Sequence, residues 1–189
     1  MDITLWIIVG IIVLVGIIFI YYYNKFKRLD IQAQADWNLI DPLLQQRLDT
    51  IPNLITMAKR VMKQEIDLFT GLAKARESAM KATSVPEKIA ANQKLGAMIS
   101  GFYARAESYP ELKSDNTMRV AMEELSGIED KIKYGRQKYD YTVQEYTETA
   151  SVVPGAWFAS MYGVNPNKWA YFKADDQAKK GINAEELLK

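Results

Sequence analysis

The sequence predicts an all-α protein in which a single N-terminal transmembrane helix is followed by an antiparallel helical bundle. Residues 3–23 contain no charged side chain, and about 20 helical residues suffice to cross the hydrocarbon core of a bilayer. Beyond this segment, apolar residues recur at steps of three and four, which is the period of an amphipathic helix. No segment shows a notable strand pattern.

Aromatic and basic residues mark the ends of the uncharged segment. Tyr and Trp prefer the headgroup level of a bilayer, and basic residues accumulate on its cytoplasmic side. The expected membrane-interface residues are Trp6, Tyr21, Tyr22, Tyr23, Lys25, Lys27 and Arg28. Because no Lys or Arg precedes the segment, we expect the N-terminus outside and the rest of the chain in the cytoplasm. A cleaved signal peptide is disfavoured, since no basic leading region and no small-residue cleavage site are present.

Two prolines interrupt the first helical run beyond the anchor. The apolar phase continues over residues 33–72, with Pro42 and Pro52 inside it. A proline removes a backbone hydrogen bond and clashes with the preceding turn, so each must kink or end the helix. Asp41 and Thr50 can cap a helix that restarts at these points. Two alternatives stay open: a turn near Pro52, which gives four bundle helices, or one long kinked helix, which gives three.

The later helices have clearer boundaries. The Ser-Val-Pro-Glu segment at 84–87 favours a helix start, because Pro fits the first turn and Glu suits the positive end of the helix dipole. The Tyr-Pro pair at 109–110 ends that helix, since the residue before proline avoids the α region. Apolar residues at 118–153 then form a heptad seam typical of a coiled coil. The Pro-Gly pair at 154–155 ends it.

The C-terminal tail is first aromatic and then charged. Its six aromatic residues are Trp157, Phe158, Tyr162, Trp169, Tyr171 and Phe172. They can pack on the bundle, dock on a neighbouring subunit or dip into the bilayer interface, and these three alternatives stay open. We therefore expect an anchor at 1–24, a bundle at 25–155 and a tail at 156–189.

The composition excludes several classes of function. With 24 basic and 23 acidic residues, the chain lacks the basic excess of a nucleic-acid binder. It has no Cys and no His, so thiol chemistry, the commonest general base and the commonest transition-metal ligand are missing. We expect no enzyme activity, no cofactor, no metal and no nucleic-acid partner. Neighbouring carboxylates such as Glu123 and Glu124 are expected to form local salt bridges on solvated faces.

Three motifs stand out in the sequence: Arg-x-Asp-x-Ile-Pro-Asn-Leu at 47–54, which is the most specific, Tyr-Pro-Glu-Leu-Lys at 109–113 and Met-Tyr-Gly-Val at 161–164. Together they resemble the LemA family, which implies the inner membrane of a bacterium as the location. The resemblance spans about residues 20–172. It implies an antiparallel bundle, usually of four helices, on an N-terminal anchor, and so favours a turn at Pro52, whereas the periodicity favours a kink. It implies no agreed biochemical activity.

Two corners and the aromatic tail are the candidate interaction sites. Arg47, Asp49 and Asn53 lie near the break at Pro52, where they either bind a partner or satisfy backbone groups that the break leaves unpaired. Tyr109, at the second corner, either binds a partner or packs on the core.

From these features we expect a non-enzymatic membrane scaffold that self-associates into a homo-oligomer. The long heptad seam, the single anchor and the aromatic tail favour this interpretation. The alternative is a monomeric, membrane-tethered adaptor whose bundle recruits another membrane or cytoplasmic protein. The expected partners are therefore the lipid bilayer and further copies of the chain, or one such protein.

Overall fold

The computed structural model describes residues 3–172, and these form six helices without a strand. The helices are α1 (Ile3–Ala58), α2 (Ile66–Lys81), α3 (Val85–Ala106), α4 (Pro110–Ser114), α5 (Asn116–Ser151) and α6 (Gly155–Met161). The predicted all-α class is therefore confirmed. The chain divides into two compact units. Among the described residues, the anchor unit holds 3–40 and 135–169, and the bundle unit holds 41–134 and 170–172.

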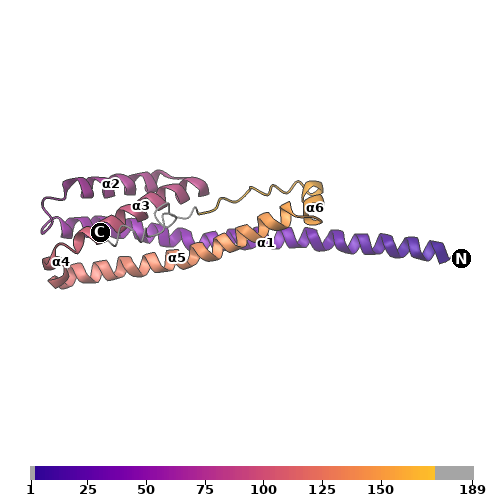
Figure 1. Ribbon diagram of the computed structural model, residues 1–189, viewed down its shortest axis with the longest axis horizontal. Coiled ribbons are helices and arrows are strands. Elements are labelled where there is room, and N and C mark those ends of the chain that lie inside the picture. The colour runs from indigo at the N-terminus through magenta and orange to yellow at the C-terminus, as the bar shows by residue number, and fades with distance from the viewer. Residues whose placement is uncertain (1–2, 173–189) are drawn as a thin grey trace, which may run out of the picture. The chain divides into compact units, whose positions relative to one another are not determined.

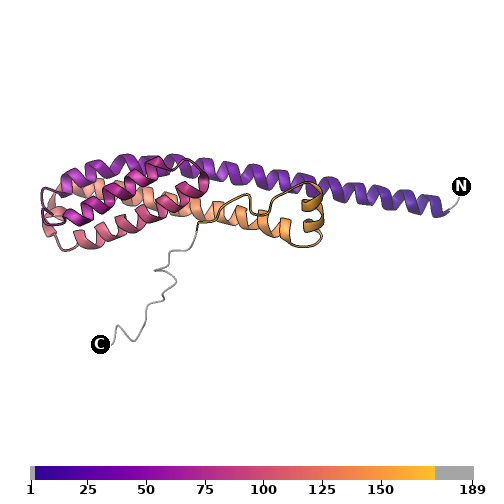
Figure 2. The ribbon, with the colours of Figure 1, turned by 90° about the horizontal axis from the view of Figure 1, so that it is seen from above.

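The bundle unit consists mainly of four antiparallel helical segments. The end of α1, then α2, α3 and the first part of α5 each run opposite to the segment before them (Figures 1 and 2). Their facing side chains form one core, with Leu54, Leu72, Leu95, Phe102 and Leu125 fully buried. The bundle thus has the four long helical segments of the first alternative.

The turn between the first two segments lies after Pro52, not at it. α1 contains both prolines and continues to Ala58, and α2 begins at Ile66. The expectation of a turn near Pro52 is therefore wrong, and so is that of one helix reaching residue 72. Pro52 has no N–H and so leaves the carbonyl oxygen of Leu48 without its helical donor. Nε of Arg76 on α2 donates to that oxygen at 2.7 Å, which compensates the lost bond.

The residues expected to cap restarted helices make other bonds instead. Thr50 Oγ1 donates to the carbonyl oxygen of Gln46 at 3.0 Å, a bond that forms inside a continuing helix. Asp41 pairs with Lys88 Nζ on α3 at 2.6 Å. Neither residue caps a helix start, because α1 is continuous through both positions.

The start of α3 follows the prediction. Ser84 is the N-cap, and its hydroxyl accepts from the backbone N–H of Glu87 while the Glu87 carboxylate accepts from the backbone N–H of Ser84. These reciprocal bonds satisfy two donors of the free helix end. The hydrogen bonds that the backbone N–H groups of Ser84 and Thr83 donate to the Glu87 carboxylate lower its pKa. α3 ends at Ala106, ahead of the Tyr-Pro pair.

The anchor unit pairs α1 with the second part of α5. The ring centroids of Trp37 and Tyr139 lie 5.7 Å apart in an edge-to-face arrangement, and both residues are buried. The helices approach closely at Gly135, where an added Cβ would lie 2.9 Å from Ile40 Cγ1. Buried positions follow the predicted seam along α5 from Met118 to Tyr146, whereas Val153, its predicted last member, lies beyond the helix and is exposed. This seam packs within the chain, so it leaves no free coiled-coil face.

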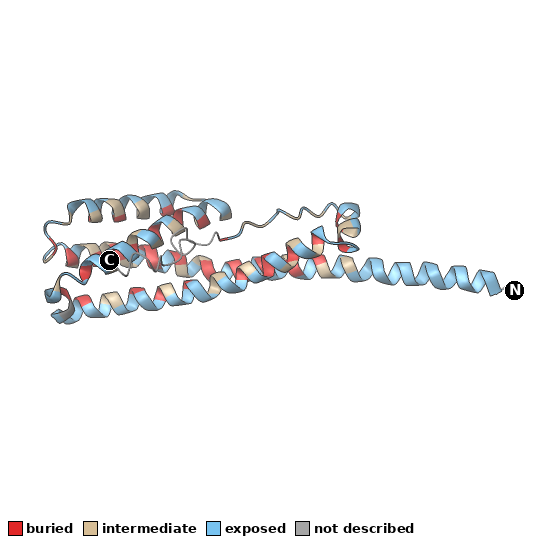
Figure 3. Cartoon of the chain, viewed as in Figure 1, coloured by how far each residue is buried: buried red, intermediate tan, exposed pale blue. Residues whose placement is uncertain are grey.

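The first turns of α1 are covered by no other described part of the chain, and we call them bare. Every side chain from residue 3 to 21 is exposed (Figure 3). Within the described part of the chain, α1 is the one helix long and apolar enough to cross a membrane, judged by length and composition. The structure is thus consistent with the expected single N-terminal anchor.

Candidate functional site

Arg47, the first residue of the most specific motif, is buried in the bundle unit and joins three helices. Its side chain is only 3% exposed. Nη1 donates to both carboxylate oxygens of Glu129 on α5, at 3.0 and 3.3 Å. Nη2 donates to the backbone carbonyl of Asn92 on α3 at 3.0 Å and to the side-chain oxygen of the same residue. We call Arg47, Asn92 and Glu129 the arginine clasp.

The other two residues of the first corner do not join the clasp. Asp49 is exposed and accepts from Gln45 Nε2 along α1 at 2.9 Å. Asn53 is also exposed. Neither these residues nor Arg47 provides the donor that the break at Pro52 requires. That donor is Arg76, which sequence reasoning missed. The available signal was the proline itself, since the carbonyl it frees needs a donor from another element.

The second corner closes one end of the bundle unit. Tyr109 Oη and Arg105 Nε both donate to Oε1 of Glu65, at 2.8 and 2.6 Å. The Arg105 and Tyr109 hydrogen bonds lower the pKa of Glu65, and the bond to Glu65 raises the pKa of Tyr109. The Tyr109 ring is half-buried against the core. The corner therefore ties the start of α2 to the end of α3.

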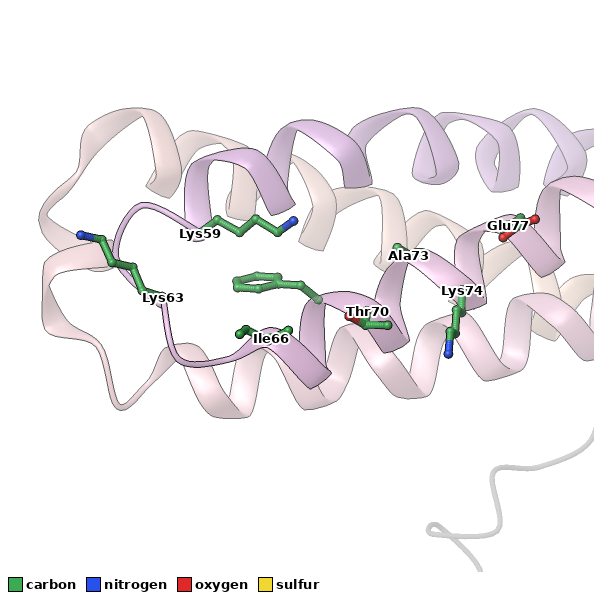
Figure 4. Close-up of a pocket in the computed structure, with 8 residues that line it drawn as sticks. Lys59, Lys63, Ile66, Thr70, Ala73, Lys74 and Glu77 are labelled. Atoms are coloured by element: carbon green, nitrogen blue, oxygen red, sulfur yellow. The ribbon is translucent and has the colours of Figure 1, made fainter.

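A groove with a basic rim is lined by the turn between α1 and α2 and by α2 itself. It encloses about 460 Å³. Its lining residues are Lys59, Lys63, Ile66, Phe69, Thr70, Ala73, Lys74 and Glu77. Figure 4 shows Lys59 and Ile66 on opposite sides of the groove. Ile66 is 69% exposed, and three lysines against one glutamate make the groove positive, although sequence reasoning did not single it out.

Two of the tail aromatics pack against α1 within the anchor unit. Phe158 on α6 stacks on Tyr22, with centroids 4.7 Å apart and planes at 10°. The Tyr162 ring lies 4.7 Å from that of Phe19, and its hydroxyl donates to the Phe19 carbonyl at 2.6 Å. α6 is thereby fixed beside the last turns of the uncharged segment.

The remaining tail aromatics differ in exposure. Trp169 Nε1 donates to Asp30 at 3.1 Å, and Phe172 is buried. Tyr171 is 40% exposed and Trp157 is 64% exposed. Among the six tail aromatics, all of which are described, these two side chains are the exposed ones, and Trp157 is the more accessible.

Except for Trp6, which lies near the start of α1, the expected membrane-interface residues lie where the exposed first section of α1 ends. Trp6, Tyr21 and Tyr23 are exposed, as are Lys27 and Arg28, whereas Tyr22 is half-buried. Lys25 Nζ lies 3.8 Å from Glu145 on α5.

Asp36 is a buried acid in the anchor unit that sequence reasoning missed. Its carboxylate is fully buried and accepts from Lys138 Nζ at 2.9 Å, Thr142 Oγ1 at 2.7 Å and Gln32 Nε2 at 2.8 Å. Burial alone raises the pKa of Asp36, but these hydrogen bonds outweigh it and the pKa lies below its ordinary value. The carboxylate therefore stays ionised and ties α1 to α5.

This network predicts a stability that depends on pH. Because the folded pKa of Asp36 is lowered, its contribution is complete above the ordinary value of 3.8 and is lost as the pH falls through the folded value. We expect Asp36→Asn to lower the melting temperature at neutral pH. Below about pH 4, the melting temperature of the variant should decrease less steeply with falling pH than that of the wild type. Circular dichroism melting of both proteins from acid to neutral pH tests this. Parallel curves for the two proteins would contradict the assignment.

Comparison with known proteins places the chain in a family. A search of curated proteins finds no match. The family model described as LemA family matches residues 36–184. The match includes the arginine clasp, the Tyr109 corner and all six aromatics of the tail. Because it covers well over half of the sequence, the chain belongs to the LemA family.

Proposed function

We propose that the protein is a non-enzymatic scaffold, anchored in the inner membrane of a bacterium through residues 3–23 and self-associating there into a homo-oligomer. The bare apolar turns of α1 support the anchor, since a long exposed apolar surface is unstable in water and suited to lipid. Lys25, Lys27 and Arg28 follow the segment directly, which favours a cytoplasmic C-terminal side.

The observation that carries self-association is an exposed apolar row on α1, beyond the membrane segment. Ile31, Ala35 and Leu39 lie at steps of four, so they share one face of the helix. Ile31 is 67% exposed and Leu39 is 59% exposed. Within the anchor unit, α5 packs on the opposite, buried face of α1 and α6 packs against Phe19 and Tyr22, so neither covers the row. A second copy presenting the same row would bury it.

We expect Leu39→Lys to lower the particle mass of the full-length protein in mild detergent, measured by light scattering. A charge at the centre of an apolar contact would have to be desolvated on association. Gln34→Lys is the matched control, because it adds the same charge at an exposed polar position of the same helix. A wild-type particle of one copy, or equal masses for the two variants, would contradict self-association through this row.

The alternative, a monomeric adaptor, is favoured by the basic groove. Lys59, Lys63 and Lys74 surround an apolar floor that includes Phe69, a combination suited to an acidic amphipathic helix of a partner protein. A one-copy wild-type particle would move the proposal to this function. Crosslinking from the groove would then test it.

A further inference from the structure

The position of α6 has a consequence for how the protein meets the bilayer. Tyr162 and Phe158 hold α6 against Phe19 and Tyr22, which belong to the last turns of the uncharged segment. The rise of an α-helix is about 1.5 Å per residue, so Phe19 and Tyr22 lie within about 6 Å of the segment's end. If that segment spans the membrane, α6 lies at the depth of the headgroups.

The outer side of α6 and of the turn before it is apolar and exposed. Val152, Val153, Trp157 and Met161 are 63%, 56%, 64% and 67% exposed. Residues 149–167 contain no charged side chain, although charged residues make up 25% of the whole chain. A turn and a helix that face water can carry charged side chains, so their absence over such a length is not explained by exposure to water. In the acyl region of a bilayer, by contrast, a charged side chain has a large free-energy cost.

We propose that α6 and the preceding turn form a second membrane contact, lying in the plane of the interface with Val153, Trp157 and Met161 in the boundary between headgroups and acyl chains. This inference rests on the proposed anchoring through α1. Interfacial helices sink their apolar face about 5–10 Å below the headgroups, and Trp prefers this depth. Phe158 and Tyr162 fix the inner side of α6 on α1, so the outer side is left to contact lipid.

The commitment to lipid rather than a second copy follows from continuity. α6 covers Phe19 and Tyr22 on one side of α1. Lipid would cover the other side of the same turns. The exposed side chains of α6 therefore extend an apolar surface that already belongs to the anchor. An interface between copies would have to form inside the headgroup layer to reach them.

The chain contains no cysteine, so single cysteines report on single sites. We would prepare Trp157→Cys and Met161→Cys of the full-length protein, label each with an environment-sensitive fluorophore and reconstitute them in vesicles of phosphatidylcholine and phosphatidylglycerol. Both positions are exposed, so the label does not disturb packing. Gln144→Cys, exposed on α5 of the same unit, is the aqueous control. Ile12→Cys is the control for the anchor.

We expect labels at 157 and 161 to be quenched by spin-labelled lipid and to be several-fold less sensitive to aqueous iodide than the label at 144. Iodide sensitivity equal to that at 144, without lipid quenching, would overturn the inference. Protection from both quenchers would show that a second copy covers α6, which would overturn it as well. If spin-labelled lipid quenches the label at 12, α1 is in the membrane, and this result holds even when the contact proposed for α6 is wrong. If iodide quenches the label at 12, both the anchoring through α1 and the contact proposed for α6 are wrong.

Discussion

Arg47→Leu is expected to lower the free energy of unfolding by about 2–4 kcal/mol, because it leaves buried acceptors without their donor. The guanidinium serves three acceptors at once: the Glu129 carboxylate, the Asn92 carbonyl and the Asn92 side-chain oxygen. Leucine keeps part of the apolar stem in place but donates nothing. Urea unfolding of the full-length protein in detergent, followed by circular dichroism, measures the loss.

The arginine clasp also predicts which substitutions lower the free energy of unfolding most. The Glu129 side chain is 30% exposed, whereas that of Arg47 is 3% exposed. Water can therefore solvate part of Glu129, and Glu129→Gln should cost only about 1 kcal/mol. Asp49→Asn, two positions after Arg47 in the same motif but exposed, should cost still less. Equal losses at positions 47 and 49 would mean that the clasp does not hold the bundle together.

The elements that could be predicted from the sequence are those set by local chemistry. The start of α3 depends on Ser84 and Glu87, three positions apart, and both signals are visible in the sequence. α5 ends at Ser151, shortly before the Pro-Gly pair at 154–155 that was expected to end it, and this signal too is visible in the sequence. The uncharged segment is likewise a local property, and it forms the bare start of α1.

Whether α1 continues through Pro52 depends on a hydrogen-bond partner that is distant in the sequence. A proline shows that one carbonyl is free, but not whether a donor reaches it. Arg76 lies 28 residues from Leu48 in the chain, and its approach requires α2 to be in place. The periodicity correctly indicated that the helix continues past Pro52, and it failed only at the turn after Ala58, where the apolar phase happens to persist.

The candidate residues also divide into features visible in the local sequence and features that depend on partners distant in the chain. The sequence singled out Arg47 by its motif, yet its burial depends on Asn92 and Glu129, which no pattern links to it. The aromatic tail was visible as a composition, but which side of α6 meets α1 is decided by Phe158 and Tyr162 together. A composition cannot distinguish these inward rings from the outward Trp157.

Gly155→Ala is expected to destabilise the anchor unit by about 3 kcal/mol, since overpacking against a fixed backbone costs about 1–3 kcal/mol and lost aromatic pairs add to it. A Cβ at this position would overlap the carbonyl oxygen of Thr149 and would lie 3.4 Å from Tyr22 Cε1. The first of these atoms is backbone and cannot rotate away. α6 must therefore shift, and the stacking of Phe158 on Tyr22 is lost with it.

Gly127→Ala provides the matched control because the substitution is the same and the outcome is opposite. Gly127 lies inside α5, and an added Cβ there meets no atom within 4 Å. Alanine in an open helix interior stabilises by about 0.5–1 kcal/mol, so the melting temperature should rise slightly at 127 and fall at 155. If both variants melt alike, α6 is not seated on α1 as described. If only Gly155→Ala melts early, the docking of α6 is part of the stability of the anchor unit, and the membrane contact proposed for Trp157 and Met161 is held by the folded protein rather than by lipid alone.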